Sequence, residues 1–512
     1  MQKVIDFFNK HKYLETFVKF FLFFLFLWVS YDILIYLSRI NNDNLQTIRT
    51  MMIIPLIYCF SKACYLKGKN ELTDEKLAYL IMIVGFTLRI GYAFYTGSNC
   101  RQHDVEMYNG NQLNINGQGH FSYTYIIYST GRLPTEIKWQ FYHPPLWHSL
   151  CALFMHIYGF VERVNDVAIL YDANIILSSF VSCLTLFYFK KMIFSLSDNK
   201  IFRIISFLLL ACYPQFFIMA GWLNNEGLAF MFMIISLYYG LVFHKNRSWL
   251  SIILCGITLG CGAMSKVSSA LICAPLLFIF LYDFIIDLKN HKAKKTIIQG
   301  VSFIGIVAPI SLWFIIRNIV KFGITSIGVP GIDPSSSLGV INYSYWQRFG
   351  VPNLFNLNEN IWCILRPNDN GYLDYNVWLY TLKCSIFGEY SYWQGEIFAY
   401  ILLICNILFS LLTIFCICYV IIKEFKNFNN ILMLIIFAIT LISYIIFQIL
   451  YPVTCTQDFR YMTLIILPVC YFVGKFFVYE FKSKWATCLK YISLSLVLCF
   501  CLSSILFYIS CR

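Results

Sequence analysis

The sequence predicts an all-α polytopic membrane protein, and three observations support that class. Of the 512 residues, 59% are apolar and only 13% are charged, whereas a soluble domain has about 45–50% apolar and about 25% charged residues. The apolar residues gather in long runs, most of which approach the roughly 20 residues that a helix needs to cross the hydrocarbon core. No run shows the alternation of a β-barrel strand. This composition excludes a soluble enzyme, a disordered regulator and a small disulfide scaffold.

Long apolar runs recur to the end of the chain, and we expect about 13 transmembrane helices from them. The runs cover residues 17–38, 49–65, 76–97, 144–160, 167–189, 201–220, 226–243, 248–265, 268–286, 297–318, 397–422, 431–451, 460–479 and 487–509. The first run is longer than the apolar region of a cleavable signal and lacks a small-residue cleavage site. We therefore expect it to remain as a membrane helix.

Lysine clusters between the runs set the expected orientation, since positive residues favour the inner side of a membrane. Three clusters are placed inside, at 289–295, 423–426 and 475–490. The polar stretches 98–143 and 319–396 then lie outside and are expected to fold as loops with short helices. Crossings counted from the two ends disagree by one, so one of the segments 144–160 and 167–189 is expected not to span. The net charge of +13 therefore reflects membrane topology, and no nucleic-acid-binding motif is present.

Many of the 20 cysteines lie inside apolar runs, where a thiol behaves as a small hydrophobic group. No CxxC pair and no Cys/His metal spacing is present. The sequence leaves open whether a disulfide joins two of the cysteines that fall in loops, namely Cys100, Cys363, Cys384 and Cys455. We assign no metal ligand from the sequence, and a divalent cation bridging Glu106 and a histidine stays an open alternative.

Two carboxylates at the ends of apolar runs are the candidate catalytic groups. Asp104 lies where the chain leaves the third run, so it can act as a general base toward an acceptor hydroxyl or amine. The alternative for Asp104 is a solvated loop acid. Glu226 opens a helix after Asn224 and Asn225, where an acid suits the helix dipole whatever its function. Glu106 is a second acid, or a ligand, on the same loop as Asp104.

Histidines and cations at helix ends are the candidate substrate- and phosphate-binding groups. They are His103, His143, Lys266, Arg317 and Arg460. His143 precedes two prolines that can open a helix, and a capping role is its alternative. Arginine matches phosphate geometry and lysine serves as a point charge, whereas snorkelling to the surface is the alternative for these cations. Arg460 lies two residues after Asp458, which can simply pair with it.

Other function classes remain open or are disfavoured at this stage. No phosphate-binding glycine loop, Walker motif, GxSxG or HExxH is present, which argues against a primary pump. A transporter or flippase for a lipid-linked or polar solute predicts polar residues near the membrane midplane and inverted repeats, and neither is clear. An envelope polysaccharide polymerase or ligase, with a lipid-diphosphate donor, would also suit the large outer loops.

Several of these motifs resemble a known family. His103–Asp104, Gly119–His120, Gly131-x-Leu-Pro134 and residues 139–146 resemble the first outer loop of GT-C membrane glycosyltransferases. The branch that they resemble contains protein O-mannosyltransferases and aminoarabinose transferases. Shorter stretches similar to later motifs of that branch are Asn225–Gly227, Ser265–Lys266, Trp313–Asn318 and Asp458–Tyr461. The resemblance covers roughly residues 76–512.

The resemblance implies a GT-C fold and the transfer of a sugar from a polyprenyl-phosphate donor to a protein, glycan or lipid acceptor outside the membrane. It implies that Asp104 is the base and that His143 faces the donor phosphate. Glu226 replaces the usual aspartate with one more methylene, so a supporting role is expected for it. The expected location is a bacterial plasma membrane, with multiple crossings and the active site on the outer face.

The runs and loops divide the chain into four expected parts. Residues 1–70 would form two extra N-terminal transmembrane helices, and residues 71–318 a GT-C catalytic transmembrane core that carries the first outer loop. Residues 319–396 would form the second large outer loop, and residues 397–512 the C-terminal transmembrane helices.

Overall fold

The computed structural model describes residues 12–41, 44–98, 100–136, 138–323 and 333–511, and most of them are helical. The α-helices are α2 (Lys12–Asn41), α3 (Asn44–Gly68), α4 (Asp74–Thr96), α5 (His120–Thr130), α6 (Leu146–Glu162), α7 (Val167–Asp172), α8 (Asn174–Leu196), α9 (Lys200–Cys212), α10 (Pro214–Ile218), α11 (Glu226–Asn246), α12 (Trp249–Ser265), α13 (Cys273–Lys289), α14 (Ala293–Phe322), α15 (Tyr345–Phe349), α16 (Val377–Phe387), α17 (Glu396–Glu424), α18 (Phe428–Leu450), α19 (Ile466–Phe476) and α20 (Lys484–Ser510). The 3₁₀ helices are η1 (Met219–Gly221), η2 (Val267–Ile272), η3 (Leu354–Asn358), η4 (Thr454–Gln457) and η5 (Phe459–Ile465). A short antiparallel hairpin pairs β1 (Tyr108–Asn109) with β2 (Gln112–Leu113).

The expected class, an all-α polytopic membrane protein, is confirmed, whereas the count of about 13 spans is not. In the described ranges, 11 helical segments are long and apolar enough to cross a membrane, or up to 12 if one bent pair counts as a span. α6 and α12 have only 17 residues each and fall short of that length. The continuous segment 167–196 qualifies. Of the two doubtful segments, only 167–189 therefore lies in a helical segment with the length and composition of a span.

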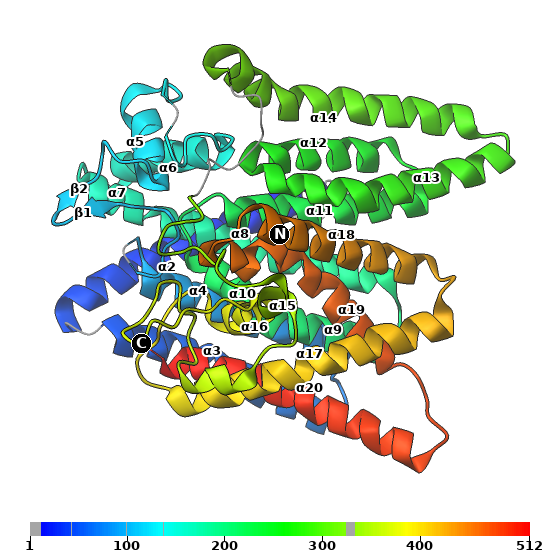
Figure 1. The fold of residues 1–512 in the computed structure, drawn as a ribbon. Coiled ribbons are helices and arrows are strands. Elements are labelled where there is room, and N and C mark those ends of the chain that lie inside the picture. The colour runs from blue at the N-terminus through cyan, green and yellow to red at the C-terminus, as the bar shows by residue number, and fades with distance from the viewer. Residues whose placement is uncertain (1–11, 42–43, 99, 137, 324–332, 512) are drawn as a thin grey trace.

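The elements of the first polar loop and the lysine-bearing connections lie at opposite ends of the helix bundle (Figure 1). The long helices run side by side across the view, and β1, β2, α5 and α7 lie at their left end. The connections α13–α14, α17–α18 and α19–α20 lie at the right end. These three connections carry the lysine clusters that the sequence places inside. The arrangement agrees with the expected separation of positive connections from the polar loops.

A break between α9 and α10 is stabilised by a buried arginine. The two helices are bent by 51° at Tyr213, since Pro214 cannot continue the helical hydrogen bonds. Arg89 of α4 is 1% exposed and donates to the freed carbonyls of Leu210 and Ala211, at 3.4 and 3.1 Å. A cation at this depth is tolerated because backbone carbonyls satisfy it.

The polar loop 333–396, which the sequence predicts to be part of the second outer loop, packs against the segment that precedes α19. Val340 donates its N–H to Pro452 at 3.0 Å, and Thr454 donates its N–H to Leu338 at 2.8 Å. Gln457 donates from Nε2 to the carbonyl of Asp374 at 2.8 Å. The loop thereby fixes the residues just before Asp458.

We expect Lys383→Met to destabilise this loop strongly. Lys383 and Asp374 are both fully buried, with Nζ 3.0 and 3.1 Å from the two carboxylate oxygens. Removing the lysine leaves an uncompensated buried charge, which costs about 3–5 kcal/mol of stability. Thermal unfolding in detergent measures the effect, and Arg366→Met, at an exposed position of the same loop, is the control. Equal melting temperatures for both variants would contradict the prediction.

Candidate active site

Asp104 lies in the predicted first outer loop, and its backbone carbonyl caps the start of α5. α5 begins at His120, whose N–H donates to the carbonyl of Asp104 at 2.9 Å. Gly119 precedes α5, and a Cβ there would lie 2.4 Å from the Val105 carbonyl oxygen, so this close approach requires glycine. Asp104 has φ +56°, a left-handed conformation that costs about 1–3 kcal/mol and persists where the surroundings enforce it. The strain therefore lies at the predicted base.

Gln102 joins the same loop to the chain that precedes α11. Its Nε2 donates to the carbonyls of Gly97 and Gly221, at 2.5 and 2.6 Å. Its Oε1 accepts from the N–H of Leu223 at 2.9 Å. The loop that carries Asp104 is thus held against the segment that leads to Glu226.

Two motifs that the sequence places far apart form one unit at the start of α11. Glu226 is the first residue of α11, Lys266 follows α12, and their side chains form an ion pair. Asn225 donates from Nδ2 to the carbonyl of Ser265 at 2.9 Å, and Asn224 Oδ1 accepts from the N–H of Glu226 at 3.0 Å. Because its carboxylate is engaged by Lys266, the arrangement favours a supporting role for Glu226.

Arg460 lies between two carboxylates. Its Nη1 is 3.5 Å from Asp104 Oδ2, and its Nε is 3.3 Å from Asp458 Oδ2. The Arg460 side chain is 8% exposed, whereas that of Asp104 is 39% exposed. A substrate can therefore reach the Asp104 carboxylate, and Arg460 supplies a buried positive charge beside it.

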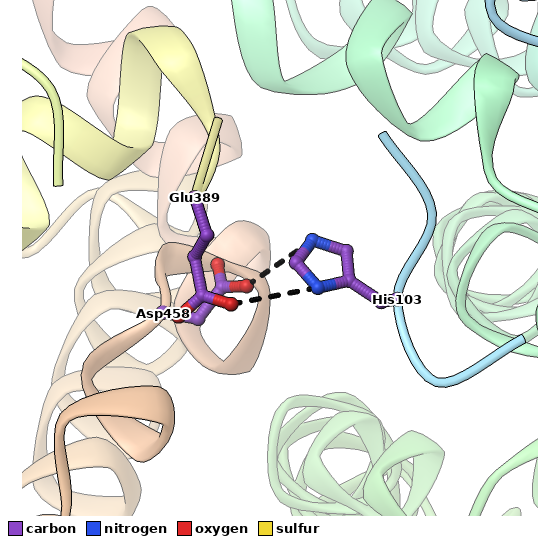
Figure 2. Close-up of side chains that lie close together, drawn as sticks. All are labelled: His103, Glu389 and Asp458. Carbon is purple, nitrogen blue, oxygen red and sulfur yellow. Dashed lines mark ion pairs between the residues drawn. The ribbon is translucent and has the colours of Figure 1, made fainter. Parts of the chain in front are cut away.

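His103, Glu389 and Asp458 converge from three segments of the chain (Figure 2). The imidazole Nδ1 lies 3.5 Å from Glu389 Oε2, and Nε2 lies 3.5 Å from Asp458 Oδ2. Glu389 follows α16, and its Oε1 accepts a hydrogen bond of 2.5 Å from the Tyr380 hydroxyl. One imidazole and two carboxylates are metal-ligand types, although the sequence assigned no metal ligand.

Burial sets the protonation of the loop groups in the site. Burial, and next the charge of Arg460, lower the pKa of His103 well below its ordinary value. Burial, and next the charge of Lys266, also lower the pKa of His143 well below its ordinary value. Burial, and next the charge of Asp458, raise the pKa of Glu389 well above its ordinary value. Both histidines are therefore neutral near pH 7, and His143 can meet a phosphate only as a hydrogen-bond donor and not as a cation.

A cavity of about 520 Å³ opens beside Lys266. Its polar wall is formed by Tyr142, His143, Lys266 and Tyr461. Most of the other wall residues are apolar and come from η2, α13 and α18, among them Val267, Leu271, Ala274, Ile439 and Phe447. The cavity therefore combines one charged end with an apolar remainder.

Two further cavities are connected to the first through shared residues or contacts. A small one of about 40 Å³ has Glu226 and Arg460 in its lining and shares four residues with the first, namely Lys266, Ser268, Leu271 and Tyr461. A third of about 690 Å³ is lined by Tyr95, Cys100, Arg101, Glu389, Tyr390, Ser391, Trp393 and Gln394. Arg460 lines the second cavity and Glu389 lines the third. The pairs Arg460–Asp104, Arg460–Asp458, Asp458–His103 and His103–Glu389 connect them.

Residues 142–315 match the family model described as dolichyl-phosphate-mannose-protein mannosyltransferase. The matched segment contains His143, Glu226 and Lys266. The match covers about a third of the chain and shows a similarity to this family over that segment. No curated protein sequence matches this chain.

Solved structures similar to this chain are oligosaccharyltransferases from Archaeoglobus fulgidus. One is archaeal oligosaccharyltransferase AglB in complex with an inhibitory peptide and a dolichol-phosphate, with 13% identity and a TM-score of 0.46 over 84% of this chain and 55% of that one. Another is the apo form, with 12% identity and a TM-score of 0.45 over 84% of this chain and 56% of that one. The match with this chain thus spans little more than half the length of these structures.

Two predicted substrate-binding residues lie apart from this group. Arg317 donates from Nη2 to the Pro134 carbonyl at 2.7 Å, and in the described part of the chain it lines none of the three cavities. Glu106 is exposed on the first outer loop, and partial desolvation followed by the charge of Asp104 raises its pKa. Their roles stay predictions, and a direct contact of Arg317 with the donor phosphate is not favoured by this geometry.

The candidate site also contains residues that sequence reasoning did not single out. Glu389, Tyr142 and Tyr461 line the cavities or the cluster around Asp104. Tyr142 and Tyr461 belong to motifs named from the sequence, whereas nothing in the spacing of Glu389 distinguishes it from other loop acids. The loop cysteines left open for a disulfide, Cys100, Cys363, Cys384 and Cys455, are all free thiols.

Proposed function

We propose that this protein is a membrane glycosyltransferase of the GT-C superfamily that moves a sugar from a polyprenyl-phosphate donor to an acceptor at the outer face of the membrane, with Asp104 as the general base. One observation carries the proposal. The accessible Asp104 carboxylate lies 3.5 Å from the buried Arg460 guanidinium, which lines the small cavity next to Lys266. A proton acceptor therefore adjoins cations that can hold a phosphate.

The cavity of about 520 Å³ suits the donor lipid. Its apolar walls on η2, α13 and α18 can hold the first isoprene units, because those units are as apolar as the membrane core. Lys266 at its polar end would bind the phosphate as a point charge, and neutral His143 would donate a hydrogen bond to it. A charged end joined to an apolar groove matches an amphipathic lipid phosphate.

The proposed reaction is a single displacement at the anomeric carbon. Asp104 takes the proton of the acceptor hydroxyl, and the acceptor oxygen forms a bond to the anomeric carbon. The bond from that carbon to the phosphate oxygen breaks, and the electron pair leaves with the polyprenyl phosphate. Arg460 and Lys266 stabilise the negative charge that develops on the phosphate. One displacement inverts the configuration of the anomeric carbon.

The third cavity, of about 690 Å³, is the proposed approach for the acceptor. Its aromatic walls include Tyr390 and the exposed Trp393, and Arg101 stacks on Tyr392 with 4.1 Å between the guanidinium carbon and the ring centroid. Such walls bind an extended peptide or a sugar through stacking and hydrogen bonds. The description of the matched family model favours a protein acceptor.

The proposed orientation follows from the distribution of charge. The lysine-bearing connections lie at the end of the bundle away from the first outer loop, so the loop end would face outward. We propose the plasma membrane as the location and retain the four-part division of the chain at residues 70, 318 and 396 as a prediction.

Mass spectrometry of the polyprenyl-phosphate lipid pool tests the proposed function. Cells that lack this protein should accumulate one polyprenyl-phosphate sugar, and expression of the wild type should clear it. The mass of the accumulated lipid would identify the sugar. An unchanged pool would contradict the proposed donor.

We expect Ala274→Trp to impair use of a long-chain donor. Ala274 lines the first cavity, and an indole there would occupy space proposed for the isoprenoid. The KM for a long-chain donor should rise about tenfold, equal to about 1.4 kcal/mol of lost binding, with a smaller change for a donor truncated to one or two isoprene units. Leu277→Trp, an exposed position of the same helix, is the control. Equal effects on both donors would contradict the assignment of the cavity.

We expect Lys266→Met to lower kcat/KM about 100-fold, because it removes a cation from the leaving phosphate. Since the change also leaves Glu226 unpaired, the double variant Glu226→Gln, Lys266→Met separates charge from packing. The double variant should regain thermal stability but not activity. Recovery of activity in it would show that Lys266 serves only to neutralise Glu226. Lys321→Met, at an exposed position on α14, is the matched control.

A further inference from the structure

We propose that a cavity at the lysine-bearing end of the bundle binds the headgroup of an anionic phospholipid such as phosphatidylglycerol. The cavity, which we call the basic cavity, has a volume of about 500 Å³, within the range of about 300–1,000 Å³ that is usual for small-molecule sites. Its lining includes four cationic side chains, those of Arg247, Lys292, Lys294 and Lys295. Among the described residues, it shares none with the three cavities of the candidate active site. The proposed sugar transfer gives it no role.

The basic cavity lies where four helices end or begin. Arg247 follows α11, Trp249 begins α12 and Asp287 lies in the last turn of α13, whereas the three lysines flank the start of α14. The connection between α13 and α14 lies at the end of the bundle opposite β1, β2, α5 and α7 (Figure 1). A headgroup of the adjacent leaflet can reach such a position, because the ends of spanning helices lie at the membrane surface, where basic pockets between helices bind anionic headgroups.

Three of the four cations are available to a ligand. Arg247 is already engaged, since its Nη2 lies 2.7 Å from Asp283 Oδ1 and its Nη1 lies 3.4 Å from Asp287 Oδ2. The other three are exposed and make no ion pair within the described part of the chain, namely Lys292, Lys294 and Lys295. Asp287 is the one acid among the described residues of the lining. The basic cavity therefore carries unbalanced positive charge, which favours an anionic ligand.

Hydrogen bonds fix the polar part of the basic cavity. Gln299 is 1% exposed and donates from Nε2 to the Arg247 carbonyl at 3.0 Å. Thr296 is 9% exposed, and its hydroxyl donates to the Asp287 carboxylate. The backbone between α13 and α14 is closed by a hydrogen bond of 2.8 Å from the N–H of Lys292 to the carbonyl of Asp287. The lysines therefore belong to a defined turn and helix, so less freedom is lost when they bind a headgroup.

An apolar rim favours a lipid over a soluble anion. Trp249 and Ile298 line the basic cavity and are 41% and 47% exposed. Tryptophan is typical of the membrane interface, where its ring contacts lipid and its N–H contacts water. Only four of the 30 residues of α14 are buried, namely Thr296, Gln299, Phe314 and Asn318. The acyl chains below the headgroup can therefore pack along α14, and a free phosphate has no such contact.

The bound lipid would also stabilise the folded chain. Positive charges that lie close together repel one another and destabilise the compact state. A headgroup phosphate shared by the three lysines would offset that repulsion and hold the start of α14 against the ends of α11 and α13. Since a ligand that binds only the folded state raises its stability, phosphatidylglycerol should raise the melting temperature of the wild type.

Native mass spectrometry of the purified full chain tests the site. The chain in detergent is titrated with phosphatidylglycerol, phosphatidylcholine or inorganic phosphate. The wild type should retain one phosphatidylglycerol about tenfold more tightly than phosphatidylcholine, because basic side chains recognise the net charge of the headgroup. The double variant Lys294→Gln, Lys295→Gln should bind phosphatidylglycerol about tenfold less tightly. The control Lys482→Gln, Lys484→Gln removes two exposed lysines of another connection at the same end of the bundle and should bind like the wild type.

The two double variants distinguish a site from general surface charge. Both pairs of lysines are exposed, so both variants should melt like the wild type when no lipid is added. An equal loss of binding in the two variants, or no loss in either, would overturn the proposal. Inorganic phosphate that binds as tightly as phosphatidylglycerol would overturn the assignment to a lipid.

Tryptophan fluorescence locates the bound lipid. Brominated phosphatidylglycerol should quench more emission than brominated phosphatidylcholine at the same mole fraction, and this excess should disappear in Trp249→Phe. Trp485→Phe changes a tryptophan that is 86% exposed at the start of α20, and this control should keep the excess. An excess that survives Trp249→Phe would place the lipid elsewhere and overturn the site. None of these measurements depends on sugar transfer, so their failure would leave the proposed function standing.

Discussion

Asp104→Asn should reduce sugar transfer by about 100- to 10,000-fold while the protein folds normally, because general-base catalysis contributes about that much to a rate. The amide has almost the shape of the carboxylate but cannot accept the proton of the acceptor. The backbone of Asp104 is held by its hydrogen bond to α5 and not by its side chain, so the loop should keep its conformation. Transfer of radiolabelled sugar to the acceptor fraction measures the loss.

Matched variants make this result specific. Glu136→Gln removes an acid that is 71% exposed on the same outer loop and should retain wild-type transfer. Asp104→Glu keeps the charge but moves it by one methylene, so partial activity is expected. In cells, Asp104→Asn should fail to clear the accumulated polyprenyl-phosphate sugar. Full clearance by this variant would show that another group accepts the proton.

The sequence predicted the class of the fold because membrane helices leave a strong local signal. Apolar runs and lysine clusters depend only on neighbouring residues and on the solvent properties of the bilayer. The number of spans was harder to predict, since α6 and α12 are apolar helices of 17 residues that fall just below the length of a span. The bend at Pro214 adds a further ambiguity, because one broken span and two short helices share the same hydropathy.

The sequence could predict those site residues that lie together in one local motif. It could not predict the contacts that form only when distant segments pack against one another. Asp104 and His143 lie in a recognisable loop, and the structure places both around the cluster of cavities. The pairing of Glu226 with Lys266 could not be predicted, because it joins the ends of two different helices. Glu389 comes from a loop that approaches His103 only after the whole bundle has packed, so no local pattern indicates it.

Arg317 illustrates the limit of a motif carried over by resemblance. The stretch Trp313–Asn318 predicts a phosphate-binding arginine, and arginine chemistry alone cannot distinguish a phosphate from a backbone carbonyl. In the structure its guanidinium donates to the carbonyl of Pro134 and to the side chain of Asn318, at 2.7 and 2.9 Å. The contact with Pro134 connects α14 to the first outer loop, so the guanidinium N–H groups of Arg317 have a structural role here.

Arg460→Gln should lower kcat/KM about 100- to 1,000-fold, the typical loss when one preorganised donor to a developing negative charge is removed. Arg460 is the buried cation that contacts Asp104, so the substitution removes charge both from the proposed phosphate site and from beside the base. Kinetics with purified donor and acceptor would show the loss mainly in kcat, because the phosphate gains most of its charge as the glycosidic bond breaks.

Arg460→Lys distinguishes charge from geometry at the same position. Lysine keeps the positive charge and can still pair with Asp458, so the thermal stability of this variant should stay close to that of the wild type. Lysine lacks the planar fork that reaches Asp104, Asp458 and the phosphate together, so its activity should remain at least tenfold reduced. If Arg460→Lys is both stable and fully active, the guanidinium serves only to balance buried carboxylates. If it is stable and slow, Arg460 acts on the transition state through its geometry, as the proposed displacement requires.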